Sequence, residues 1–326
     1  MAISKFCSTS IMRFELRALL LSVILSGIVG ACRPNGSGVQ PSTADETEDE
    51  LARLTDSIRS IISSAPGEIG VALITGRGDT VAINNEDKYP LMSVFKLHQA
   101  ISLCDLFDRT GWSLDTVVAI PRSQMNPSTW SPMLKDHDGD TIDLSVRELL
   151  VYTLTLSDNN ASNYLFSNFQ SVAETDSFMA GLIPRESFRL SVTEDEMWLD
   201  HDLCYKNHSS PLGAAVLLNR LVCDSIISPG SGGFLLETLR KCVTGADRIV
   251  APLGDKTGVE VAHKTGSGFT KENGVLTAHN DVAFVTLPDG GHYTLAILVK
   301  DFHGSESEAS AIMARISALV YNTIII

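Results

Sequence analysis

The amino-acid sequence predicts an α/β fold with two lobes, one built on an antiparallel sheet and the other all-helical. Residues 48–90 and residues 250–326 both combine helical periodicity with short apolar strand patterns. Residues 91–249, between them, are mostly helical in pattern and are interrupted by polar loops. We expect both ends of the chain to enter one sheet, because strands and helices of this kind bury their apolar faces in a shared core. A functional site is expected between the two lobes.

The N-terminal part of the sheet lobe is predicted to be a helix followed by a hairpin. Apolar residues recur at helical spacing over residues 51–62, and Pro66-Gly67 ends that helix. Residues 69–75 and 80–83 then have the composition of strands, and the turn sequence at residues 76–79 joins them.

The C-terminal part is predicted to add three strands and a helix. Strand patterns cover residues 259–263, 282–287 and 293–299, with a Pro-Asp-Gly-Gly turn at residues 288–291. The last helix begins with a capping box at residues 305–308, in which a serine and a glutamate satisfy each other's backbone N–H groups. Terminal helices are therefore expected to cover one face of the sheet.

The first 31 residues are predicted to be a secretory signal. Basic residues precede an apolar run at residues 18–31, and this run ends in small residues. With 14 residues it is too short to span a bilayer comfortably. The motif Val-Gly-Ala-Cys that ends at Cys32 resembles a bacterial lipobox, which predicts lipidation of that cysteine. A plain signal peptide with an incidental cysteine is the alternative. Either Met1 or Met12 can serve as the start.

The composition separates a tether from the folded part. Residues 32–47 are rich in Gly, Pro, Ser and acidic side chains, which predicts a flexible tether, and residues 48–326 form the folded domain. The chain is 44% hydrophobic and 20% charged, as in globular proteins, and its net charge of −14 excludes a basic surface for nucleic acid. We therefore expect an exported protein in the periplasm that touches a bacterial membrane only through a lipid at its N-terminus.

Four cysteines lie in the folded part, at Cys104, Cys204, Cys223 and Cys242. Their pairing cannot be deduced from sequence, and we expect buried thiols or at most one disulfide. Their spacing is not typical of zinc sites, so no metal is expected.

The first chemical motif pairs a serine with a lysine. Ser93 and Lys96 are three residues apart at the start of a helical pattern, so their side chains share a face. A serine hydroxyl becomes nucleophilic when a base takes its proton, and a buried lysine can be that base. The alternative for this pair alone is an ordinary helix start with a solvated lysine.

Two further motifs follow in the chain. Ser157-Asp158-Asn159 offers a hydroxyl for proton transfer and an amide for a substrate carbonyl, although these residue types also cap helices. Lys264-Thr265-Gly266, on the strand pattern, suits a substrate carboxylate, and its glycine would let a ligand approach the backbone. A second copy of these letters, residues 256–258, follows a turn-like stretch and is predicted to be a loop.

The three motifs in this order resemble those of class A serine β-lactamases, over nearly all of residues 48–326. The resemblance implies a five-stranded antiparallel sheet with flanking helices beside an all-helical lobe, no cofactor, and a monomer that acts on a small-molecule β-lactam. The sequence Thr-Glu-x-x-Met at Glu194 resembles the extended-spectrum cephalosporinase branch and implies that Glu194 activates the deacylating water, with Glu196 as a competing choice. Trp198 stands where most of these enzymes have an asparagine beside that water.

The resemblance also implies roles for three other residues. Trp130 would form an aromatic wall beside the substrate, with a core tryptophan as the alternative. Arg248 would supply a second cation for the substrate carboxylate, with an ordinary surface arginine as the alternative. The backbone N–H groups of Ser93 and Ser267 would form the oxyanion hole.

The implied reaction is hydrolysis of penicillins and cephalosporins through an acyl-enzyme, which gives antibiotic resistance. Ser93 attacks the ring carbonyl, and its proton goes either to Lys96 directly or to Glu194 through water. Ser157 passes a proton to the departing nitrogen, and Lys264 holds the carboxylate. Two alternatives stay open: a penicillin-binding D-alanyl-D-alanine peptidase, and a lipoprotein that binds β-lactams or peptidoglycan without catalysis.

Overall fold

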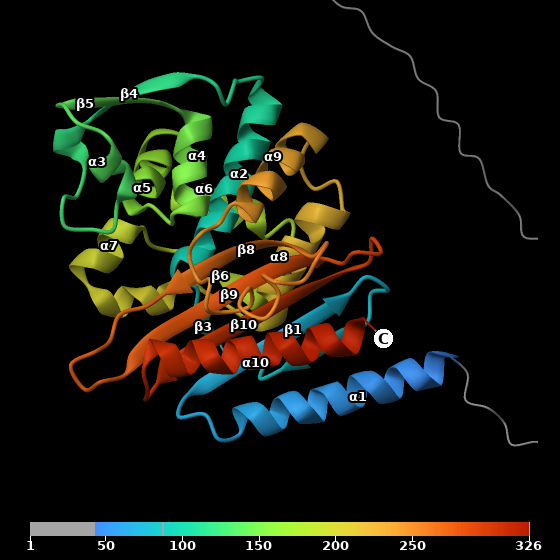
Figure 1. The fold of residues 1–326 in the computed structure, drawn as a ribbon. Coiled ribbons are helices and arrows are strands. Elements are labelled where there is room, and N and C mark those ends of the chain that lie inside the picture. Colours follow the sequence, from blue (N-terminus) through green and yellow to red (C-terminus); the bar gives the residue numbers. More distant parts are fainter. Residues whose placement is uncertain (1–42, 87, 326) are drawn as a thin grey trace, which may run out of the picture. The chain divides into compact units, whose positions relative to one another are not determined.

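The computed structural model describes residues 43–86 and 88–325 (Figure 1). The predicted signal, Cys32 and most of the predicted tether lie outside these residues. Helix α1 (Thr43–Ile62) begins inside the segment expected to be tether, so that prediction extended too far towards the domain. No helix in the described part of the chain has the length and apolarity needed to cross a membrane.

A five-stranded antiparallel sheet joins the two ends of the chain, as predicted. Its strand order is β2-β1-β10-β9-β8. Strand β1 pairs with β2 and also with β10, for example at Leu73 and Leu295. The strands are β1 (Glu68–Thr75), β2 (Thr80–Ile83), β8 (Glu260–Ser267), β9 (Leu276–Thr286) and β10 (His292–Phe302).

Helices cover both faces of this sheet. Helices α1 and α10 (Glu306–Ile324) lie together over one face, where Val71 and Leu73 are buried (Figure 1). Helix α8 (Pro211–Cys223) packs on the opposite face, towards which Ala72 points. The helical pattern of residues 91–249 predicts that this helix belongs to the helical lobe, which is wrong for α8. Its close packing depends on Gly70, where an added Cβ would lie 2.4 Å from Pro211 Cγ.

Strand β9 begins six residues earlier than predicted because polar side chains interrupt its apolar pattern. Asn280 is fully buried and donates to Pro90 O at 2.7 Å, while its Oδ1 accepts from Val299 N at 3.0 Å. Asp281 is also buried and lies 2.9 Å from His263. Hydrogen-bonded polar groups can be buried at little cost, so this segment is strand although it lacks apolar alternation.

The middle of the chain forms the helical lobe around the buried helix α2 (Phe95–Thr110), which contacts α4, α5, α6 and α9. Two small sheets interrupt the predicted helical pattern. The helices are α3 (Pro132–Asp136), α4 (Val146–Thr155), α5 (Asn159–Asn168), α6 (Val172–Met179), α7 (Glu194–Leu199) and α9 (Pro229–Arg240). The short strands are β3 (Tyr89–Pro90), β4 (Val117–Pro121), β5 (Thr141–Ser145), β6 (Phe188–Arg189) and β7 (His208–Ser209).

The four cysteines of the domain are free thiols. Cys104 and Cys204 are buried, as expected. Cys223 is exposed and Cys242 is partly exposed, so the expectation that all four are buried is wrong for these two.

Candidate active site

A cleft of about 490 Å³ brings the three motifs together. Ser93, Ser157 and Thr265 line it, one from each motif. They come from the start of α2, the turn before α5 and the edge strand β8. The motifs are separated by more than 60 residues in sequence, so their convergence is produced by the fold.

Ser93 lies in a one-turn 3-10 helix (Met92–Val94) that continues directly into α2. Met92 before it has a φ of +46°, which is unfavourable for a residue with a side chain. Lys96 follows on the next turn, and its Nζ donates to Ser93 Oγ at 3.0 Å. Lys96 is 0% exposed, so the alternative of a solvated lysine is wrong.

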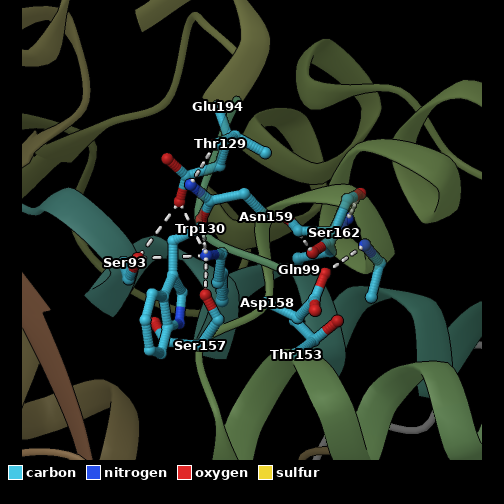
Figure 2. A network of polar contacts seen from close by, with 12 residues as sticks. Ser93, Gln99, Thr129, Trp130, Thr153, Ser157, Asp158, Asn159, Ser162 and Glu194 are labelled. Atoms are coloured by element: carbon cyan, nitrogen blue, oxygen red, sulfur yellow. Dashed lines mark hydrogen bonds and ion pairs between the residues drawn. The ribbon is translucent and has the colours of Figure 1, made fainter. Parts of the chain in front are cut away.

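The Lys96 ammonium is enclosed by hydrogen-bond acceptors. Besides Ser93 it donates to Ser157 O at 2.8 Å and Asn159 Oδ1 at 2.6 Å, and it forms a 2.8 Å ion pair with Glu194 Oε1. Ser93 Oγ in turn donates to Glu194 Oε1 at 3.1 Å. Figure 2 shows these contacts converging between Ser93, Glu194, Asn159 and Ser157. An ammonium is a donor only, so this set of acceptors matches the charged form of the lysine.

The Ser157-Asp158-Asn159 motif combines a site with a helix cap. Asp158 is the N-cap of α5 and accepts from Ala161 N at 2.9 Å, so the capping alternative is right for this residue. Burial raises the pKa of its carboxyl, and the hydrogen bonds that it accepts oppose that effect. Ser157 has a φ of +59°, and its Oγ accepts from Lys264 Nζ at 3.0 Å. Asn159 Nδ2 donates to Thr129 Oγ1 at 2.7 Å, which fixes the amide.

Lys264 is 0% exposed beneath the cleft. Burial lowers its pKa to about 8, and the positive charge of Lys96 acts in the same direction. The second copy of the motif, residues 256–258, lies in the turn before β8, as predicted.

Gly266 makes a close contact within the protein. A Cβ at this position would lie 2.3 Å from Leu91 O and 3.1 Å from Val94 N. The turn that carries Ser93 therefore approaches the glycine on this side, and the approach of a ligand to its backbone stays a prediction. This close contact holds strand β8 against the turn and sets the position of Ser267 relative to Ser93.

The structure distinguishes between the two candidate glutamates. Glu194 begins α7, is 7% exposed, lines the cleft and pairs with Lys96. Glu196 completes a capping box, because its Oε2 accepts from Thr193 N at 2.7 Å and from Thr193 Oγ1 at 2.9 Å. The geometry favours Glu194 as the acidic residue of the site.

Trp130 and Arg248 differ in how they relate to the cleft. Trp130 lines the cleft and is 54% exposed, so it is not a core tryptophan. Arg248 is 5% exposed, which excludes an ordinary surface arginine, and it lies behind Ser267. Its guanidinium donates to Ser267 Oγ at 2.5 Å and to Asn280 O at 2.7 Å. Arg248 therefore contacts Ser267, which lines the cleft, but its own side chain does not line the cleft.

Sequence reasoning missed several residues of the cleft. Thr244 touches Thr265, with 2.5 Å between the two Oγ1 atoms. The ring of His201 lies 4.1 Å from that of Phe269, so the segment after α7 meets the segment after β8 at the cleft. Trp198, noted only as a departure from the family pattern, is 45% exposed and lines the same wall. These residues lie in no motif, so no sequence signal marked them.

In the described part of the chain, His, Cys, Asp and Glu side chains form no group of three or more that could hold a metal ion.

Two serines, each hydrogen-bonded to a buried lysine, in a cleft between a five-stranded sheet and a helical lobe, are typical of serine acyl-transfer enzymes. A family model described as β-lactamase enzyme family matches residues 53–324, so the chain belongs to that family. It is a class A enzyme that hydrolyses β-lactams, as its relatives and structural neighbours indicate.

The similarity extends over most of the chain. A β-lactamase of Phocaeicola vulgatus is 56% identical and covers 86% of this chain and 88% of its own. The extended-spectrum β-lactamase PER-1 of Pseudomonas aeruginosa is 31% identical and covers 85% of this chain and 89% of its own. Among solved structures, a β-lactamase of Chitinophaga pinensis has a TM-score of 0.79 at 34% identity, over 83% of this chain and 98% of that one.

Proposed function

We propose that Ser93 is the nucleophile of this β-lactamase and that Glu194 accepts its proton. Ser93 has one hydroxyl proton, and because Lys96 donates to its Oγ, that proton is free to point at Glu194 Oε1, 3.1 Å away. A base must be within hydrogen-bond reach of the proton that it abstracts, and Glu194 meets this condition without an intervening group. In this step Lys96 stays charged and stabilises the alkoxide as it forms.

Other residues of the cleft complete the acylation step. The backbone N–H groups of Ser93 and Ser267 stabilise the oxyanion, and the Gly266 contact sets their spacing. Ser157 passes a proton to the departing ring nitrogen, supported by the 3.0 Å hydrogen bond from Lys264 to its Oγ. The cation of Lys264 and the hydroxyl of Thr265 hold the substrate carboxylate, while Asn159 holds the side-chain carbonyl.

Once the proton that Glu194 took from Ser93 has replaced the one that Ser157 gives to the ring nitrogen, the Glu194 carboxylate activates the water that hydrolyses the acyl-enzyme. The observation that carries this proposal is the position of its carboxylate, which is nearly buried and lies within hydrogen-bond distance of both Ser93 and Lys96. Trp198 replaces the usual asparagine beside this water. We therefore assign the orientation of the water to Glu194 and Ser93. This arrangement separates a β-lactamase from a penicillin-binding peptidase, which stays acylated.

We further propose that the substrates include cephalosporins with bulky side chains as well as penicillins. The exposed rings of Trp130 and Trp198 line a cleft of about 490 Å³, which suits large apolar substituents. The relative PER-1 is named an extended-spectrum β-lactamase, in agreement with this proposal. Steady-state kinetics with a penicillin, two cephalosporins and a carbapenem would define the spectrum.

The decisive test replaces Glu194 by glutamine. With a chromogenic cephalosporin, we expect Glu194→Gln to lower turnover by about 10²- to 10⁴-fold, because the proposed base of both acylation and deacylation is lost, and intact-protein mass spectrometry should show the acyl-enzyme forming more slowly than in the wild type. Glu196→Gln is the matched control, because glutamine preserves the capping box and should keep wild-type turnover. Undiminished turnover of Glu194→Gln would refute the assignment. A stoichiometric burst without turnover in the wild type would instead indicate the peptidase, and β-lactam binding without turnover that Ser93→Ala leaves unchanged would indicate a binding lipoprotein.

For the N-terminal segment, we propose export to the periplasm and lipidation at Cys32, with the domain acting as a monomer. The support is the basic, apolar and small-residue order of residues 1–31, ending in Cys32. Incorporation of radiolabelled palmitate, with Cys32→Ser as the control, tests the anchor. Equal labelling of both proteins would contradict it.

A further inference from the structure

A second cleft of about 340 Å³ lies beside β8, next to the substrate cleft along the same strand. Cys242 and His263 both line it. Cys242 lies on the segment that follows α9, and this segment runs along the free edge of β8. Cys242 thus sits beside His263, and Thr244 sits beside Thr265, two residues further along each segment.

The thiol belongs to a three-residue relay that the proposed hydrolysis does not use. Cys242 and His263 line the same cleft, and His263 Nδ1 lies 2.9 Å from Asp281 Oδ1. Asp281 is fully buried, and its second oxygen accepts from Ile249 N at 3.3 Å. The carboxylate therefore fixes the orientation of the imidazole and favours its protonated form.

The charges of this relay favour a thiolate. Burial alone would lower the pKa of His263, but the adjacent Asp281 carboxylate outweighs that effect and raises it to about 10. Burial likewise opposes ionisation of Cys242, but the hydrogen bond and charge of His263, helped by Lys264 and Thr244, lower its pKa to about 7. A thiolate beside an imidazolium is the arrangement that makes cysteines reactive.

We propose that Cys242 is a covalent modification site at which its thiolate attacks low-molecular-weight disulfides and other small electrophiles that enter the second cleft. With a disulfide, a bond forms between Cys242 Sγ and one sulfur of the reagent while the S–S bond of the reagent breaks. Cys242 is oxidised to a mixed disulfide, and the other half of the reagent is reduced and leaves as a thiolate, which takes a proton from water.

The modification would weaken substrate binding in the first cleft, a consequence that rests on the proposed function. Cys242 Sγ lies 3.3 Å from Thr244 Oγ1, and Thr244 Oγ1 lies 2.5 Å from Thr265 Oγ1. The thiolate also favours the charged form of Lys264. An adduct on Cys242 displaces Thr244 and removes that negative charge, so both groups proposed to hold the substrate carboxylate are weakened.

The test compares the four thiols of the domain in one protein. The full chain is treated with iodoacetamide at pH 7, and the rate at each cysteine is measured by peptide mass spectrometry. Cys223 is the internal control, because it is more exposed but burial raises its pKa above the usual value. We expect Cys242 to react at least about tenfold faster than Cys223, from the larger thiolate fraction. Cys104 and Cys204 should react slowest, because burial raises the pKa of each to about 12.

The second arm uses 2-hydroxyethyl disulfide and measures hydrolysis. Modification should lower kcat/KM for a cephalosporin by about fivefold or more, and dithiothreitol should restore it. Cys242→Ser should be insensitive to the reagent, with the same kcat/KM before and after treatment, whereas Cys223→Ser should respond like the wild type. His263→Gln should slow labelling of Cys242 to the rate of Cys223.

The outcomes separate this inference from the proposed function. Labelling of Cys242 no faster than that of Cys223 in the wild-type protein would overturn the modification site, whether or not the variants fold. Fast labelling with unchanged kcat/KM would overturn the link to the substrate cleft. Failure of the proposed function would appear as absent turnover in untreated protein, a result on which the labelling ratio does not depend.

Discussion

The contact between Gly266 and the turn that carries Ser93 provides a direct test of how the fold builds the oxyanion hole. Gly266→Ala adds one methyl group on the side of β8 that faces this turn. The new Cβ would lie 2.3 Å from Leu91 O, where an ordinary contact needs about 3.4 Å. The nearest atom is a backbone oxygen, and Met92 Cβ at 3.1 Å cannot rotate away either, so the strand and the turn must separate by about 1 Å.

The expected effect on activity is much larger than the effect on stability. A displacement of about 1 Å in a catalytic group can cost about 10²-fold, so kcat/KM should fall by about two orders of magnitude. Overpacking of this kind destabilises by about 1–3 kcal/mol. For a domain of this size that corresponds to a fall in Tm of about 2–12 °C. The variant should therefore be folded at 25 °C but nearly inactive.

The assay pairs steady-state hydrolysis of a chromogenic cephalosporin with thermal unfolding followed by circular dichroism. Gly233→Ala is the matched control, because Gly233 lies within α9 and an added Cβ there meets no atom within 4 Å. Alanine is the better helix former, so this control should keep its activity and gain about 1 kcal/mol. A folded Gly266→Ala protein with more than about a third of the wild-type kcat/KM would refute the reasoning, since it would mean that the spacing does not limit catalysis.

Three further predictions follow from the same structure. Burial lowers the pKa of Lys264 to about 8, so its positive charge is present below that pH. We therefore expect kcat/KM for an anionic β-lactam to fall as the pH rises through about 8. The pH profile of Lys264→Met should lack this fall. Asp158→Ala leaves the buried donors of Ser131, Met133 and Ala161 without their acceptor. The free energy of unfolding, measured by urea titration, should fall by about 2–5 kcal/mol. A smaller fall would contradict the account of the cap. Ser305→Ala removes the cap of α10 and should cost about 1 kcal/mol with kcat/KM unchanged; a change in kcat/KM would contradict the view that α10 is remote from the cleft.

The sequence predicted the parts of the fold that local patterns encode. The capping box at Ser305 marked the start of the last helix correctly, because both of its hydrogen bonds form within four residues. The pattern failed where tertiary contacts decide. Strand β9 was predicted too short because Asn280 and Asp281 are polar, and only their distant partners make them suitable for burial. Helix α8 was assigned to the wrong layer because nothing in its own periodicity tells which apolar surface it will cover.

The site was predicted as far as its motifs extend. Ser93, Lys96 and Lys264 could be named because their spacing is chemically distinctive when the motifs occur together. The choice between Glu194 and Glu196 needed the structure, since both are acidic residues in one turn of helix and only one carboxylate points into the cleft. Thr244 and His201 could not be found, because they reach the cleft through chain reversals that leave no periodic signal.

Departures from favourable backbone geometry cluster where the reactive groups are held. Two of the four described non-glycine residues with positive φ, Met92 and Ser157, lie on the segments that carry the two serines proposed for attack and for proton transfer. Such a conformation costs about 1–3 kcal/mol and persists only where the surroundings enforce it. Here Gly266 presses against the first segment, and the Asp158 cap fixes the second. The strained backbone therefore orients the side chains of Ser93 and Ser157 towards one cleft before a substrate binds. Helix propensity does not encode such a conformation, so neither orientation could be derived from it.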